Sequence, residues 1–87
     1  MKKYLRIPQP VEAIQYNGHN DTELRRWSEG NVIGSPVLEP TEDNPTGRYV
    51  QIIGGLIGRV GDYIIKDYGN YYAMREKQFL KEFVVAL

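Results

Sequence analysis

The sequence RYVQIIGGLIGRV, residues 48–60, decides the fold. Both of its ends are rich in β-branched residues, and Gly54 and Gly55 stand between them, a pattern typical of a tight hairpin. We therefore expect a strand over 48–53, a two-residue turn at the glycine pair, and an antiparallel strand over 56–60.

The chain after this hairpin continues as a meander. Residues 63–66 and 71–74 have strand composition, and turn residues precede each of them: Gly61 and Asp62, then Gly69 and Asn70. Residues 75–80 contain good helix formers and predict a short helical turn, followed by a closing strand over 83–87. The alternative is one continuous helix through residue 83.

The chain before the hairpin predicts one strand, one helix and an edge strand. Residues 11–16 alternate apolar with polar side chains, as a half-buried strand does. Asn20 followed by Glu23 fits a capping box, and Gly30 supplies a left-handed stop, so a helix lies between them, docked through Leu24 and Trp27. Residues 32–38 predict an edge strand, and residues 39–47 an exposed loop.

These elements fit one domain over residues 1–87. The predicted fold is α+β: a mostly antiparallel sheet of about five strands, one helix packed on it, and a short C-terminal helical turn. A closed small barrel is the alternative fold.

Composition restricts the function. Eleven basic residues balance eleven acidic ones, so no net charge draws the protein to nucleic acid or to an anionic membrane. No apolar run is long enough to span a membrane, and we expect a cytoplasmic protein. The chain has no cysteine and a single histidine, His19, so we predict no disulfide, no metal site and no cofactor.

No set of residues has the pattern of a catalytic site. Asp62 and Glu12 are isolated carboxylates, and Ser28 and Ser35 lack the sequence setting of a nucleophile. The glycines of residues 54–61 are followed by strand residues, whereas a phosphate-binding loop needs a helix there. We therefore predict a non-enzymatic protein.

An aromatic and cationic group near the C-terminus is the candidate binding surface. Tyr71 and Tyr72 are adjacent on a predicted strand and must point to opposite faces, so one of them is expected at the surface. Exposed tyrosine beside a cation suits a protein interface, and it also suits stacking on a nucleobase. The predicted binding residues are Tyr68, Tyr71, Tyr72, Arg75, Lys66 and Lys77.

Three segments carry a family resemblance. Residues 1–4 (MKKY), 11–16 (VEAIQY) and 60–66 (VGDYIIK) resemble those of a family of small bacteriophage and prophage proteins with a Pro-Gly-Asp-Tyr-Ile-Ile type of motif. Here Val60 stands where the motif has proline, and the central part from 31 to 57 carries no matching pattern. The resemblance implies a phage or prophage origin and a small α+β domain, and it brings no activity or site residues with it.

Two functional hypotheses follow. The first is a non-enzymatic phage accessory protein that binds a bacterial host protein through its sheet rim and exposed tyrosines, and so antagonises or redirects that host factor. The second is a small-ligand binder that sequesters a nucleotide or similar anion between the tyrosines and the cations. The apolar tail, residues 84–87, also offers an edge for pairing into a homodimer.

Overall fold

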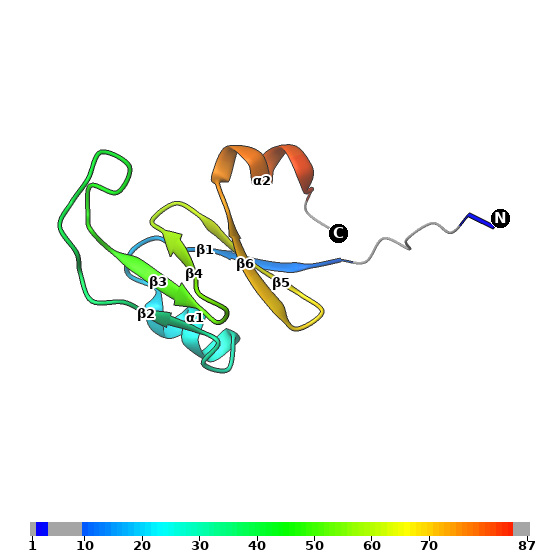
Figure 1. The fold of residues 1–87 in the computed structure, drawn as a ribbon, viewed down its shortest axis with the longest axis horizontal. Helices are drawn as coiled ribbons and strands as arrows, with labels where there is room; N and C mark the ends of the chain where they lie inside the picture. Colours follow the sequence, from blue (N-terminus) through cyan, green and yellow to red (C-terminus); the bar gives the residue numbers. More distant parts are fainter. Residues whose placement is uncertain (1, 4–9, 85–87) are drawn as a thin grey trace.

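The described part of the chain contains six short strands and two short helices (Figure 1). The computed structural model describes residues 2–3 and 10–84. In chain order the elements are β1 (Glu12–Gln15), α1 (Asp21–Trp27), β2 (Val32–Gly34), β3 (Tyr49–Ile52), β4 (Leu56–Arg59), β5 (Tyr63–Asp67), β6 (Asn70–Met74) and α2 (Glu76–Glu82).

The strands form two three-stranded antiparallel sheets, with the orders β1-β5-β6 and β2-β3-β4. The prediction of an α+β, antiparallel fold is confirmed, whereas the single sheet of about five strands is wrong. The meander is broken at the corner between β4 and β5, where the Asp62 N–H donates to the Arg59 carbonyl and Gly61 has a φ of +97°. After this turn β5 pairs with β1 instead of continuing the β2-β3-β4 sheet.

The predicted hairpin is confirmed, with a longer turn. Val50 pairs with Gly58 and Ile52 with Leu56, so residues 53–55 form a three-residue loop in place of the expected two-residue turn. In contrast, β5 and β6 are joined by two residues, Tyr68 and Gly69, both with positive φ. That geometry is the type I′ hairpin turn that matches the twist of a strand pair.

The core lies between the two sheets and is closed by α1. Its buried members are Tyr16, Leu24, Val32, Val50, Ile52, Ile64 and Tyr71. The sheets approach closely at Gly58, where an added Cβ would lie 2.6 Å from Cδ1 of Ile64 in the other sheet and 2.9 Å from Cγ2 of Val50 in the same sheet. Glycine at this position therefore sets the distance between the sheets.

Helix α1 is held by packing more than by its own caps, as expected for a helix of seven residues. Leu24 is fully buried, and the half-buried Trp27 meets Tyr71 edge to face at 5.7 Å. The predicted capping box is not formed in its usual way, because the Asn20 side chain donates to the Gln15 carbonyl and to Glu23 Oε1. Gly30 has the expected left-handed conformation.

Strand β2 is an edge strand, as predicted, and it ends at Gly34 before Pro36. Its outer edge is closed at Val32, whose N–H donates to the buried Ser28 Oγ at 2.8 Å. The shorter strand follows from residues 35–38, where proline has no N–H for a ladder. Ser28, which the sequence placed on the helix, thus satisfies a sheet edge.

Residues 35–48, which we call the arm, connect β2 to β3 as a long loop (Figure 1). The Leu38 N–H donates to the Gly47 carbonyl and closes its base. Asn44 is 2% exposed, and its Nδ2 donates to the Arg48 carbonyl at 2.9 Å. The arm is therefore an ordered loop built around one buried amide, beyond the exposed connection that the sequence predicted.

The C-terminal part of the described chain is helical over Glu76–Glu82. Of the two alternatives left open for residues 75–83, the structure therefore shows one continuous helix, which ends just before Phe83. Phe79 stacks on Tyr63 at 3.9 Å and on Phe83 at 4.9 Å. Phe83 and Val84 are not in a strand, and residues 85–87 of the predicted closing strand lie outside the described residues. Within residues 2–3 and 10–84, neither helix has the length and apolarity that a membrane crossing requires.

Candidate functional site

The six predicted binding residues do not form one surface. Lys66 and Tyr71 are register partners near one end of the β5-β6 hairpin, whereas Arg75 follows the other end of β6. Tyr71 is 7% exposed and its ring lies against Trp27, so it belongs to the core and has no free face for a nucleobase. Tyr71 is therefore separated from the exposed members of the predicted set, whose binding role stays a prediction.

The remaining members of the predicted set are dispersed. Tyr68 is 65% exposed at the hairpin turn with a φ of +51°, an unusual conformation for a bulky residue. Tyr72 is half-buried on the face of β6 opposite Tyr71, as the alternation required. Lys77 is exposed on α2.

Lys66 is engaged by its neighbours in the sheet. Its Nζ lies 3.9 Å from Glu12 Oε2 and 6.0 Å from the centre of the Tyr71 ring. Glu12 and Lys66 are paired across β1 and β5, so this is a cross-strand ion pair. Both residues thereby have a local structural role.

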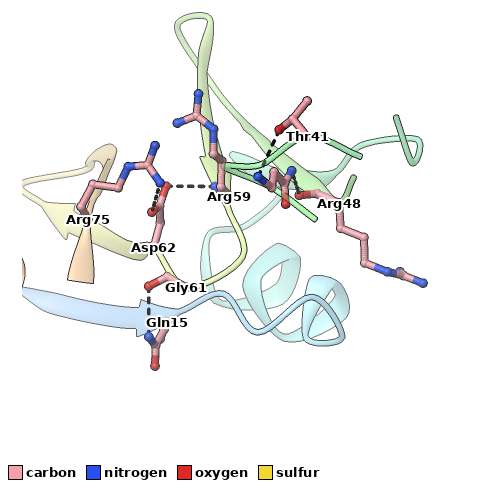
Figure 2. A network of polar contacts seen from close by, with 8 residues as sticks. Gln15, Thr41, Arg48, Arg59, Gly61, Asp62 and Arg75 are labelled. Carbon is pink, nitrogen blue, oxygen red and sulfur yellow. Dashed lines mark hydrogen bonds and ion pairs between the residues drawn. The ribbon is translucent and has the colours of Figure 1, made fainter. Parts of the chain in front are cut away.

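Asp62 is the centre of a polar corner that joins several elements (Figure 2). The Asp62 side chain is 7% exposed, and its Oδ2 accepts a hydrogen bond from the main-chain N–H of Arg59 at 3.0 Å. Its Oδ1 lies 3.8 Å from Nη1 of Arg75. The main chain adds two bonds to β1, because Gly61 N–H donates to the Tyr16 carbonyl and Tyr16 N–H donates to the Asp62 carbonyl. Gln15 Nε2 also donates to the Gly61 carbonyl at 3.0 Å.

These contacts explain the Gly-Asp-Tyr sequence at residues 61–63. Gly61 permits the turn, and the Asp62 carboxylate satisfies an N–H at the end of β4 while facing the cation that precedes α2. Tyr63 supplies the ring on which Phe79 of α2 stacks. The segment therefore connects β1, β4, β6 and α2.

A second buried polar contact lies at the start of α1. The Tyr16 side chain is 1% exposed and hydrogen-bonds the carboxylate of Asp21. Burial, and then the neighbouring negative charge of Asp21, raise the pKa of Tyr16 above its ordinary value of 10.0. The sequence showed Tyr16 as the end of a strand and gave no sign of this pairing.

A shallow groove of about 500 Å³ lies between α1 and β2. Asp21, on one side of it, packs against Gly34, where a Cβ would collide with the carboxylate. The Asp21 carboxylate thus already interacts with Tyr16 and contacts Gly34. The groove itself is widely open to solvent. The lining residues are Asp21, Thr22, Arg25, Gly30, Ile33 and Gly34.

The outer face of the β2-β3-β4 sheet is apolar and exposed. Ile33, Gln51 and Ile57 form one outward row across the three strands, and Tyr49 with Arg59 forms the next. Ile33 is 41% exposed, Ile57 46%, and Ile53 at the hairpin tip 63%. We call these residues the Ile face: Ile33, Tyr49, Gln51, Ile53, Ile57 and Arg59.

The Ile face departs from the usual pattern of an antiparallel sheet, which presents polar side chains to water. Three of the nine large hydrophobic residues exposed in the described chain belong to the Ile face: Ile33, Ile53 and Ile57. Sequence reasoning identified the strands but did not assign their apolar residues to either face of the sheet. The signal that reveals the face is apolar residues at two successive positions of β2 and of β4, since only one of two adjacent side chains points inward.

The described residues contain no group of three or more metal-ligating side chains of the His, Cys, Asp or Glu type. His19 lies in the turn before α1, where its N–H donates to Asn17 Oδ1.

Neither family models nor curated proteins match the sequence, and no solved structure matches the fold. Among the described residues, the Ile face departs from an ordinary solvated surface because Ile33, Ile53 and Ile57 are exposed on it.

Proposed function

We propose that this chain is a non-enzymatic accessory protein of phage or prophage origin that binds a bacterial host protein and so antagonises or redirects it. The observation that carries the proposal is the Ile face, where three isoleucines are 41–63% exposed on one side of a sheet. Exposed apolar patches of this kind mark interaction sites in proteins. The origin rests on the resemblance of residues 1–4, 11–16 and 60–66 to the phage family.

The composition of the Ile face supports protein binding over ligand sequestration. It contains isoleucine, tyrosine, glutamine and arginine and lacks lysine and carboxylates, which is the bias of interface centres. Sequestration of a nucleotide by the tyrosine and cation set has less support, because Tyr71 is packed against Trp27 and Lys66 faces Glu12. The binding surface we propose is therefore the Ile face, in place of the tyrosines.

The proposal is tested by affinity capture from a lysate of a bacterial host with the wild-type chain and with the double variant Ile33→Thr, Ile57→Thr. We expect one host protein to be captured by the wild type, and the double variant to lose it. Leu80→Thr is the matched control, since Leu80 is 61% exposed on α2, outside the Ile face. Equal capture by all three proteins contradicts the proposal.

A further inference from the structure

The two sheets of this molecule treat their outer faces differently. On β5, Ile64 points to the core and Ile65 to the opposite face, and both are 0% exposed. Tyr63 shares the face of Ile65, and Phe79 of α2 stacks on Tyr63. One side chain of α2, Phe79, thus packs on the outer face of the β1-β5-β6 sheet at Tyr63. The described chain provides no such contact for the Ile face, and Figure 1 shows α2 on the side of β6 and away from β2 and β3.

We propose that the partner covers the Ile face with a short amphipathic helix that places an acidic side chain beside Arg59. This inference rests on the proposed function and specifies its partner. The contact would repeat, between two proteins, the packing of a helix side chain on a sheet that Phe79 and Tyr63 show within one chain.

The size of the Ile face suits a single helix. Ile33 and Ile57 lie on the two outer strands with β3 between them, so they are about 10 Å apart at the usual strand spacing. An α-helix with side chains is about 10–12 Å wide. A second copy of the chain is a poorer fit, because a stable interface buries about 800 Å² on each partner and strands of three or four residues offer far less on one face.

The edges of this sheet favour a helix on its face over an added strand. The outer edge of β2 is closed at Val32 by Ser28 Oγ. On the other side β4 packs against β6, where Gly58 approaches Ala73. An extended peptide would need an open ladder of N–H and C=O groups at one of these edges. The face, with its isoleucines, is the more accessible surface.

The charge of the face specifies the flank of the helix. Arg59 is the only charged residue of the Ile face, and none of the ion pairs of the described residues involves it. The main-chain N–H of Arg59 donates to the Asp62 carboxylate, while Figure 2 shows the Arg59 guanidinium directed away from that carboxylate. A carboxylate from the partner would meet this cation at the rim of an apolar contact, where charge sets orientation and specificity.

The test uses two synthetic helices of about four turns, stapled because shorter isolated helices are marginal in water. Both carry leucine at i, i+3, i+4 and i+7; one has glutamate on the flank of that stripe and the other lysine. Each is titrated into the isotope-labelled full chain and followed by NMR. We expect the glutamate peptide to bind at least about tenfold more tightly, which corresponds to about 1.4 kcal/mol, with shift changes at Ile33, Gln51 and Ile57.

Two variants make the test specific. Arg59→Glu should reverse the preference, so that the lysine peptide binds more tightly, and Ile57→Thr should weaken both peptides, while Leu80→Thr changes neither. Equal affinity of the two peptides, absence of binding, shift changes centred on α2 or on Asp21, Thr22 and Arg25 of the groove, or self-association through the Ile face in sedimentation would each overturn the inference. If the double variant loses host capture while the peptides show no preference, the proposed function stands and the helical partner does not.

Discussion

The β1-β5-β6 sheet and the β2-β3-β4 sheet have similar sizes and share one core, yet they differ on their outer faces. On the first, Ile65 is buried and Tyr63 is stacked under α2; on the second, Ile33 and Ile57 are exposed. Both sheets place β-branched residues at successive strand positions. The difference teaches that such a pair of residues can be buried on both faces of one sheet and on only one face of another, according to what packs on the outer face.

The strongest way to break this comparison is to truncate equivalent outward residues. Ile65→Ala removes a fully buried side chain and should lower the free energy of unfolding by about 2–5 kcal/mol, the range for buried Ile to Ala changes. Ile57→Ala on the exposed face should change it by about 0.5 kcal/mol or less. Urea unfolding of both variants measures this. Equal losses would mean that the two outer faces are covered alike.

The contact between the sheets is tested at Gly58. Gly58→Ala places a methyl group against Ile64 Cδ1 and Val50 Cγ2, and such overpacking should cost about 1–3 kcal/mol. Ile64→Val removes Cδ1 and so relieves part of this overlap. The double variant should therefore lose less free energy of unfolding than the sum of the losses of the two single variants. A double-mutant cycle by urea unfolding gives the coupling, and strict additivity would show that the sheets are further apart than described.

The corner that joins the sheets should be sensitive to the carboxylate. Asp62→Ala leaves the Arg59 N–H without its acceptor and should destabilise the fold by about 1–3 kcal/mol. Arg75→Gln should cost about 1 kcal/mol or less, because the Arg75 side chain is 53% exposed at 3.8 Å from Asp62. Thermal unfolding ranks the two. A larger loss for Arg75→Gln would place the main stabilisation in the ion pair.

The smallest effect concerns Tyr16, which closes the core beside α1. Tyr16→Phe should cost about 1 kcal/mol near neutral pH, through loss of the hydrogen bond to Asp21. Because the pKa of Tyr16 is raised in the folded state, its stabilising effect is complete below pH 10.0 and is lost as pH rises above that value. The wild type should therefore lose more stability than Tyr16→Phe between pH 9 and about 11. Parallel pH dependences of unfolding would contradict the raised pKa.

The sequence predicted those parts of the fold that depend on local pattern. The hairpin of β3 and β4, the strand at residues 12–15 and the helix before Gly30 follow from alternation, turn residues and stop signals. The division into two sheets was not predicted, because it depends on the pairing of β1 with β5, residues about 50 positions apart in the chain. No local pattern reports a partner at that distance.

The sequence predicted a surface for protein binding but not the residues of the Ile face. Adjacent tyrosines correctly indicated that Tyr71 and Tyr72 face opposite ways, but which of them enters the core depends on Trp27, a residue of α1. The Ile face was missed because isoleucine in a strand is read as core by default. Whether a given isoleucine is inside depends on which layer covers its face, and that is a tertiary property.

The main-chain bond between Leu38 and Gly47 has a practical consequence for engineering the molecule. A loop whose two ends are held together by a hydrogen bond tolerates changes between them, so the exposed positions of residues 39–46, with the buried Asn44 kept, can carry foreign sequence. Since the chain has no cysteine, a single Asp43→Cys substitution there would give one attachment point for a fluorophore. The molecule can thus be tethered or observed from one end while the surface assigned to its partner stays unmodified.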